Sequence, residues 1–352
     1  MKRLTLGDVC KKASSNIAQK DLQDKIGAYP IYGASGLIKQ VDFYQQDKEY
    51  IAVVKDGAGI GRTMLLPAYS SVIGTMQYLL PKEGIPIDIK YLFYAVEHMN
   101  LAKYFSGATI PHIYFKDYQK EPINIPDIDT QRKISRIFDK IDALIISRKE
   151  QRTRLDQIVK SRFIEMFGVY PANPMGWEIG TIRDIVTEVR YGSSRPAVDG
   201  GKYPYLRMNN ITYGGELDLS DTKRIDIPDN ELDKCTVRRG DVLFNRTNSK
   251  ELVGKTCVYD RDEMMVLAGF VIRIRVKDCI LPEFLSAFLN TDFSKQMLLG
   301  MCKTAIGQAN INAQELQNIG LYLPPVELQR RFIQFKKETD KSKSFDDLEV
   351  AA

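Results

Sequence analysis

Residues 113–132 read I-Y-F-K-D-Y-Q-K-E-P-I-N-I-P-D-I-D-T-Q-R, and residues 311–330 read I-N-A-Q-E-L-Q-N-I-G-L-Y-L-P-P-V-E-L-Q-R. Aligned without a gap, the two stretches share a proline and a closing Gln-Arg pair: Pro126, Gln131 and Arg132 match Pro324, Gln329 and Arg330. Repetition on this scale predicts two copies of one domain. Each copy is expected to close with the same junction, in which a strand leads into a helix.

The repeat extends upstream of these junctions. The matched segments are 29–30 with 203–204, 49–55 with 240–246, 60–63 with 253–256, and 91–94 with 284–287. In the second of these matches, each copy has a strand that ends in a basic residue. The framework agrees while the loops differ, which is typical of one scaffold that carries two recognition surfaces. Two similar units suit DNA, because it presents the same kind of surface again one or more helical turns away.

Composition limits the class of protein. A chain of 352 residues with 44% apolar residues is long enough for two globular domains. No apolar run approaches the ~20 residues that cross a bilayer, and the N-terminus does not resemble a secretory signal. The five cysteines are odd in number and include no C-x-x-C pair, which favours a reducing cytoplasm over a disulfide framework or a zinc site. The net charge of +5 permits nucleic-acid binding without demanding it.

The segment between the two copies predicts one long helix. No Pro or Gly interrupts residues 129–167, and apolar residues recur at steps of three and four. We expect Asp129 or Thr130 to cap the helix and Gly168 to end it. Roughly 38 residues at about 1.5 Å each give a length of about 57 Å. That length exceeds one turn of B-DNA, about 34–36 Å, so the helix would hold two domains apart and leave base pairs between them unread.

A helix of that length with one apolar face needs a partner helix. The second copy supplies one after Pro324 and Pro325, but its apolar pattern ends at Phe335. We therefore expect a distal helix about half as long as the central one. The far half of the central helix would then expose an apolar stripe, available to a partner subunit or to a second copy of the chain.

Three loops of the second copy, 190–195, 205–210 and 245–250, mix Arg or Lys with Asn, Ser, Thr or Gly. Arg can bind guanine through two hydrogen bonds, Asn can bind adenine, and small polar groups can bind phosphate. Framework turns also require such residues, so this alternative stays open for each position. The candidate DNA-binding residues are Arg190, Ser193, Arg195, Arg207, Asn209, Asn210, Arg246, Thr247, Asn248 and Lys250 in the second copy, and Ser35, Lys39, Lys55, Arg62, Thr109 and His112 in the first.

Motifs for catalysis are missing. Residues 173–176, N-P-M-G, lack the second proline and the aromatic residue of an adenine methyltransferase motif. Residues 56–63, D-G-A-G-I-G-R-T, suggest a phosphate loop, but the glycine spacing is wrong and Arg62 stands where Lys belongs. We interpret this segment and its counterpart at 253–256 as hairpin turns, each with a cation that faces phosphate. With two histidines, no Ser-His-Asp group can be argued.

Several segments carry a family resemblance that covers nearly the whole chain. They are Trp177–Val186, Tyr203–Ile211, Val242–Thr256, Gly107–Ile113 and Pro324–Arg331. In these segments and in its twofold repeat, the chain resembles the specificity subunits of type I restriction–modification enzymes.

The resemblance implies an α+β fold with two β-rich target-recognition domains joined by long helices in an antiparallel coiled coil. The expected boundaries are 1–127 for the first domain, 128–167 for the central helix, 168–325 for the second domain, and 326–352 for the distal helix and tail. Each domain would read one half of a bipartite double-stranded DNA target. The chain would bind two methyltransferase subunits and help to organise restriction subunits. It would itself be non-catalytic, with S-adenosylmethionine, ATP and Mg expected on the partner subunits.

Three alternatives remain open. The chain could be a truncated or silent variant that acts as a protein-interaction scaffold without specific DNA readout. It could be a stand-alone enzyme on DNA, which the missing motifs disfavour. It could also be a tandem β-rich interaction module with no role on DNA, which a steep loss of DNA affinity with salt would exclude.

Overall fold

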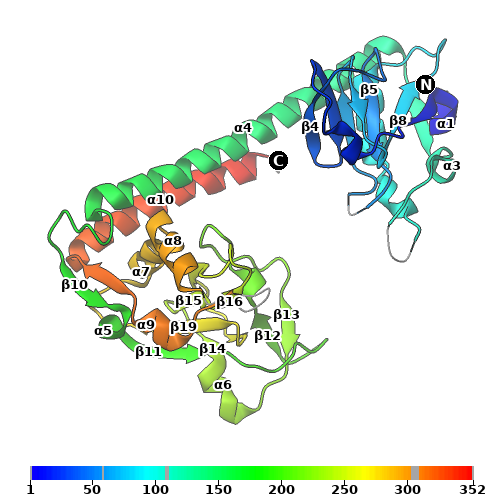
Figure 1. The fold of residues 1–352 in the computed structure, drawn as a ribbon. Coiled ribbons are helices and arrows are strands. Elements are labelled where there is room, and N and C mark those ends of the chain that lie inside the picture. The colour runs from blue at the N-terminus through cyan, green and yellow to red at the C-terminus, as the bar shows by residue number, and fades with distance from the viewer. Residues whose placement is uncertain (1, 58, 108–110, 303–308, 351–352) are drawn as a thin grey trace. The chain divides into compact units, whose positions relative to one another are not determined.

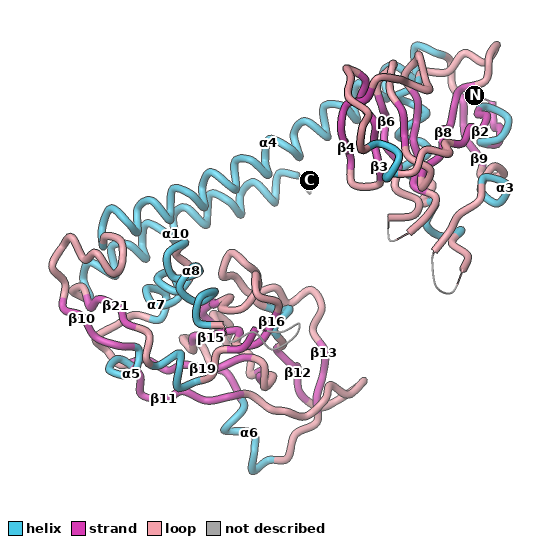
Figure 2. Tube along the Cα trace, in the orientation of Figure 1, coloured by secondary structure: helices cyan, strands magenta, loops and turns pink. Residues whose placement is uncertain are grey.

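The computed structural model describes residues 2–57, 59–107, 111–302 and 309–350, and it divides into two compact units. The first unit comprises residues 1–147 and the second residues 148–352. Each contains several small sheets and short helices, and one long helix begins in the first unit and ends in the second (Figures 1 and 2). The described residues contain no helix that is both long enough and apolar enough to span a membrane.

The first unit is built on a four-stranded sheet whose order is β2 (Cys10–Ser14), β8 (Met76–Pro81), β5 (Tyr50–Val54) and β6 (Thr63–Leu66). A second sheet has the order β4 (Gly36–Val41), β3 (Tyr29–Gly33) and β7 (Ser71–Val72), in which β3 and β7 are parallel. A third contains β1 (Lys2–Thr5) and β9 (Pro122–Ile125). The helices are α1 (Leu6–Val9), α2 (Ile89–His98) and α3 (Phe115–Tyr118), with 3-10 turns at Gln19–Leu22 and Leu101–Tyr104.

The second unit repeats this plan. Its first sheet has the order β11 (Val186–Tyr191), β19 (Val271–Val276), β15 (Val242–Asn245) and β17 (Thr256–Val258). Its second has the order β13 (Lys223–Ile225), β12 (Tyr203–Leu206), β18 (Met265–Leu267) and β14 (Thr236–Val237), again with one parallel pair, β12 and β18. Two pairs complete it: β10 (Glu178–Thr181) with β21 (Gly320–Leu323), and β16 (Thr247–Asn248) with β20 (Ala309–Asn310). The helices are α5 (Ile182–Ile185), α6 (Asp229–Cys235), α7 (Pro282–Leu289), α8 (Asp292–Met301) and α9 (Ala313–Gln317), with a 3-10 turn at Met208–Asn210.

The central strands show why these segments form buried sheets. All five residues of β5 are buried, and they alternate between two hydrophobic clusters. Ile51 and Val53 face one cluster, whereas Tyr50, Ala52 and Val54 face the other. This alternation follows from the two-residue period of a strand, and it shows that both faces of the sheet are covered. Strand β15 repeats the arrangement between two clusters of the second unit.

In both units, a glutamine at the repeated strand-to-helix junction anchors the start of the long helix that follows. Gln131 accepts a hydrogen bond from the backbone N–H of Asp88 (2.9 Å), and its amide donates to the carbonyls of Pro86 and Pro126. Gln329 accepts from Leu281 (2.8 Å) and donates to Cys279 and Pro324. Both glutamines are fully buried. The shared Gln of the sequence repeat is therefore a structural clamp, because it satisfies backbone groups of two segments at the start of the helix.

The central helix α4 (Ile128–Phe167) has 40 residues, which confirms the prediction from the uninterrupted pattern. Its cap differs from the one expected. Asp127 accepts hydrogen bonds from the backbone N–H (2.9 Å) and the hydroxyl of Thr130, so the cap is one turn earlier than Thr130 and precedes Asp129. Gly168 ends the helix with a positive φ of 81°.

The distal helix α10 (Val326–Val350) lies antiparallel to the C-terminal part of α4 in the second unit (Figure 1). Phe163 of α4 contacts Phe332, and Asp156 pairs with Lys343, so positions rise along one helix as they fall along the other. The helix has 25 residues, and the expectation of half the length of α4 was therefore too short. Beyond Phe335, Lys343 of α10 forms ion pairs with Asp156 of α4 and with Asp340. A prediction from apolar residues alone does not detect such a contact.

Within the first unit, α4 exposes an apolar stripe. Its exposed residues at helical spacing are Ile137, Phe138, Ile141, Leu144 and Ile145, of which Leu144 is 62% exposed. The expected stripe is thus present in the part of the helix that the first unit contains. The predicted α+β class, with a repeated β-rich domain and long antiparallel helices, is confirmed.

Candidate nucleic-acid interface

In the second unit, the loops singled out from the sequence meet at one turn, Ala268–Phe270, which joins β18 to β19 and which we call the second hub turn. The N–H of Ser193 donates to Leu267 (2.7 Å), and the N–H of Gly269 donates to the carbonyl of Ser193 (2.7 Å). Gly192 is required beside it, because a Cβ there would lie 2.1 Å from the carbonyl oxygen of Leu267. Loop 190–195 is therefore fixed against the hub turn by its backbone.

The other two loops join the same turn. The N–H of Ala268 donates to the carbonyl of Leu206 (2.9 Å), which precedes loop 207–210. The N–H of Arg246 donates to Phe270 (3.0 Å) and begins loop 246–250. Sequence reasoning missed residues 268–270 as the point of convergence. In the sequence, these residues appear only as a short A-G-F segment between two apolar stretches.

The first unit has the same arrangement at Ile73–Thr75, between β7 and β8, which we call the first hub turn. There the N–H of Lys55 donates to Thr75 (3.0 Å), and its carbonyl accepts from Ile113 (2.9 Å). In the second unit, Arg246 donates to Phe270, and its carbonyl accepts from Ile311 (2.9 Å). Lys55 and Arg246 therefore occupy equivalent places, each between a hub turn and the first residue of the repeated stretch.

Arg246 rests on an aromatic platform. Its guanidinium lies 4.8 Å from the ring centroid of Tyr191, and Nη1 donates to the carbonyl of Gly269 (3.4 Å). The Tyr191 hydroxyl is itself fixed, because it accepts a hydrogen bond from the N–H of Ala313 (2.8 Å). A guanidinium held over an aromatic ring can still donate from its edge, as base and phosphate recognition requires. Tyr191 was part of a recognised loop, yet its role as a platform was not predicted.

Three other arginines of the candidate set are paired with carboxylates. Arg190 pairs with Glu188 at 2.9 Å, Arg195 with Glu231 at 2.7 Å, and Arg207 with Asp221 at 2.8 Å. The hydrogen bond from Arg195 lowers the pKa of Glu231, and the same bond raises the pKa of Arg195. Both groups are therefore held in their charged forms. None of these carboxylates was singled out from the sequence.

Two candidates of the second unit serve the loop itself. Asn210 is 2% exposed, and its amide donates to the carbonyls of Asp218 (2.8 Å) and Asp221 (3.1 Å) while its oxygen accepts from the N–H of Arg207. Ser193 is also buried, and its hydroxyl accepts from the N–H of Arg195 (3.2 Å). We assign both side chains to shaping the loops, because neither is accessible to a duplex in this structure.

The remaining candidates of the second unit lie nearer the surface. Asn209 and Lys250 are exposed. Thr247 donates to the side chain of Asn310 (2.8 Å), and Asn248 accepts from the N–H of Ser249 (2.8 Å), so both are half-buried in the β16–β20 pair.

Lys255, in the counterpart of the apparent phosphate loop, does not face phosphate as expected. It is 7% exposed and donates from Nζ to the carbonyl of Met208 (2.9 Å), inside the loop that precedes Asn209. Burial lowers its pKa. Lys255 thus supports loop 205–210 from inside the second unit, a role that the local sequence could not reveal because Met208 lies far away along the chain.

In the first unit, the described candidates form two separate sets of contacts. Arg62 is exposed, and its Nη1 donates to the carbonyl of Ala34 (2.9 Å), beside Ser35. His112 pairs with Asp56, which also lies 3.9 Å from the Nζ of Lys55. Lys39 is separate, since its Nζ donates to the carbonyls of residues 22 and 23. Thr109 lies outside the described residues.

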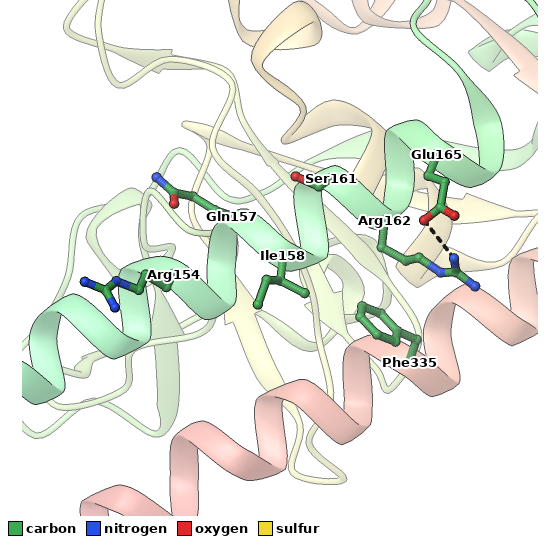
Figure 3. Close-up of a pocket in the computed structure, with 7 residues that line it drawn as sticks. All are labelled: Arg154, Gln157, Ile158, Ser161, Arg162, Glu165 and Phe335. Carbon is green, nitrogen blue, oxygen red and sulfur yellow. Dashed lines mark hydrogen bonds and ion pairs between the residues drawn. The ribbon is translucent and has the colours of Figure 1, made fainter.

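A groove of 600 Å³ follows α4 and α10 in the second unit (Figure 3). Ile158 and Phe335 point toward one another from the two helices, and Arg162 pairs with Glu165 at 2.7 Å on its rim. The remaining lining residues are Arg154, Gln157 and Ser161. The apolar floor and charged rim suit contact with another protein.

The chain matches the family model for the type I restriction modification DNA specificity domain over residues 1–157 and 174–343. It is 25% identical to the type I restriction enzyme EcoKI specificity subunit of Escherichia coli, over 65% of this chain and 52% of that protein. It is 28% identical to the putative type I restriction enzyme MjaX specificity subunit of Methanocaldococcus jannaschii, over 47% of this chain and 40% of that protein. The chain thus spans about half the length of the curated relatives that it matches.

Two solved structures share the fold. The type I restriction–modification S subunit from M. genitalium has a TM-score of 0.52 at 16% identity, covering 99% of this chain and 92% of that one. A chain solved in work on complex assembly and conformational transition of the type I R-M system has a TM-score of 0.54 at 15% identity, covering 99% and 93%. The match to the family model confirms the resemblance drawn from the sequence motifs, and these two structures share the fold.

Proposed function

The chain belongs to the type I restriction modification DNA specificity family, and on that premise we propose that it reads a double-stranded DNA target in two halves. One observation carries the proposal. Lys55 and Arg246 hold equivalent places at the two hub turns, each surrounded by polar loops that differ between the units. One scaffold that presents two different sets of side chains suits a target with two different half-sites.

We propose further that the chain directs other subunits to that target and does no chemistry itself. Two methyltransferase subunits would dock along the helices, and the groove lined by Ile158 and Phe335 supplies an apolar floor for such contact. Restriction subunits would join this assembly. S-adenosylmethionine, ATP and Mg would then belong to the partner subunits.

The test is a map of modified bases in DNA from cells that express the chain with its methyltransferase partner, compared with cells that express the partner alone. We expect a new methylated motif made of two short halves around a fixed unread gap. If no motif appears although the chain binds its partner, a scaffold without specific readout becomes the better interpretation.

Arg246→Ala is expected to relax the motif at one position of the half-site that the second unit reads. Loss of a base-reading arginine costs about 1–3 kcal/mol of discrimination, which is roughly five- to 150-fold in the selection of that base. The same methylation map measures it, with Arg239→Ala as the control because Arg239 pairs with Asp262 away from the hub turn. If Arg246→Ala and Arg239→Ala gave the same methylated motif, Arg246 would not be a base-reading residue.

The apolar stripe of α4 is proposed to mediate self-association when partner subunits are absent. Ile141→Glu combined with Leu144→Glu should keep the chain monomeric, because each places a charge on a surface that association would bury. Light scattering over a range of concentrations measures the mass. Arg136→Glu, on another face of the helix, is the control, and a wild-type chain that is monomeric at every concentration would contradict the proposal.

A further inference from the structure

Arg195 is held by a carboxylate along one edge of its guanidinium. Nε donates to Oε2 of Glu231 (3.2 Å) and Nη2 donates to Oε1 (2.7 Å), a bidentate arrangement. Among the residues that the structure describes, Nη1 of Arg195 makes no hydrogen bond. The outer Nη1–Nη2 edge, which forms the fork that binds guanine O6 and N7, therefore keeps free donors.

Arg207, at the next loop, is also held by a carboxylate, but through Nη2 alone, and its Nε is buried without a hydrogen-bond partner. Its Nη2 donates to Oδ2 of Asp221 (2.8 Å) and to the carbonyl of the same residue (3.2 Å). The two arginines differ in exposure, since the side chain of Arg195 is 46% exposed and that of Arg207 is 24% exposed, beside an Asp221 that is 70% exposed. Glu231 comes from α6 and Asp221 from the turn before β13, so neither carboxylate belongs to the loop that it holds.

Both pairs connect to strand β12. The hydroxyl of Tyr205 donates to the carbonyls of Ser193 (3.2 Å) and Arg195 (3.0 Å), which ties the first loop to β12. Arg207 directly follows that strand. The pairs therefore flank the strand end that the second hub turn contacts through Leu206.

We propose that Glu231 and Asp221 are specificity-determining residues of the second unit. An arginine free to rotate binds any phosphate, and this attraction dominates non-specific DNA affinity. A carboxylate on one edge cancels most of that attraction and fixes the plane of the guanidinium. The free edge of Arg195 can then satisfy only a partner with matching geometry, such as guanine, whereas Arg207 would reach its partner through Nη1. The inference rests on the proposed function, because it assumes that this surface meets DNA.

Glu231→Gln keeps the shape of the side chain and removes its charge. We expect it to raise affinity for random-sequence duplex by about two- to fivefold, the range of one exposed ion pair. The log–log dependence of affinity on salt should steepen by up to about 0.9 for one added phosphate contact. Selection at one base pair should weaken. Asp221→Asn should behave alike at a different base pair.

The matched control is Asp262→Asn. Asp262 pairs with Arg239 at 2.7 Å, so this variant makes the same change in charge and breaks the same kind of bond, but beside no proposed reading residue. If Glu231 acted only through its charge or its ion pair, Glu231→Gln and Asp262→Asn would select the same DNA bases. Circular dichroism confirms that each variant is folded.

The experiment uses the full chain assembled with its methyltransferase partner. It is incubated with a pool of duplexes of randomised sequence, and the bound fraction is sequenced at several salt concentrations. A wild-type motif that loses one position in Glu231→Gln or Asp221→Asn, but not in Asp262→Asn, supports the inference. A wild-type motif that is unchanged in both test variants overturns it and leaves the proposed function standing. If the wild-type complex selects no motif, the proposed function fails and the inference fails with it.

Discussion

Phe332→Ala is expected to lower the free energy of unfolding of the second unit by about 3–5 kcal/mol, the range for deleting a buried phenylalanine ring. Phe332 is fully buried where α10 begins. Its ring lies 5.2 Å from that of Phe163 and 5.7 Å from that of Phe167, both on α4. These two rings also pack against Phe284 of α7. One ring therefore connects both long helices to the core, and its loss leaves a cavity that cannot close without moving a helix.

The measurement is denaturant unfolding followed by the fluorescence of Trp177, the only tryptophan in the sequence. Trp177 packs on the same core and donates from Nε1 to the carbonyl of Phe167 (3.1 Å), so it reports on the second unit. Phe332→Leu should cost much less, because it conserves most of the volume. Phe105→Ala, at a 63% exposed site of the first unit, should leave this transition unchanged. A loss below about 1 kcal/mol for Phe332→Ala would show that the helices do not depend on this contact.

Gln329→Leu is expected to destabilise the second unit by about 3 kcal/mol. Leucine fills the space but leaves the N–H of Leu281 and the carbonyls of Cys279 and Pro324 without their partner. Each buried polar group left unsatisfied costs about 1–3 kcal/mol, and the less buried of the three can recover part of this from water. Trp177 fluorescence again measures the loss.

The repeat provides a matched variant. Gln131→Leu breaks the same three kinds of bond in the first unit, to Asp88, Pro86 and Pro126. It should lower the stability reported by circular dichroism while shifting the Trp177 transition by no more than about 0.5 kcal/mol, since distant sites act independently. Gln334→Leu, at an exposed glutamine whose amide donates to Glu338, is the neutral control. An equal response of Trp177 to Gln131→Leu and Gln329→Leu would mean that the two units unfold together.

Much of the scaffold could be predicted because its causes are local or periodic. The continuous apolar run Tyr50–Val54 predicts a buried strand wherever the rest of the chain lies. The absence of Pro and Gly from 129–167 predicts one long helix, and Gly168 marks its end. The shared Pro and Gln-Arg of the two junctions identify the repeat, although the sequence does not reveal that Gln131 and Gln329 act as buried clamps.

The candidate site was predicted only in part. The sequence located the three polar loops of the second unit, and the match of 49–55 with 240–246 placed Lys55 and Arg246 together before their common geometry was visible. Composition could not separate side chains that face solvent from those that shape a loop. Asn209 and Asn210 are neighbours of one type, yet the first is exposed and the second is buried.

The sequence by itself determined the repeat, the family, the long helix and the loops that carry polar residues, because periodicity and motif spacing are properties of the chain. Only the tertiary structure decided how the loops converge on the hub turns, that Lys255 supports loop 205–210, and that Glu231 and Asp221 hold Arg195 and Arg207. The partners of Lys255, Arg195 and Arg207 lie between 14 and 47 residues away along the chain. Hydrogen bonds and ion pairs depend on distance and angle in space, and the packing of the sheets sets both.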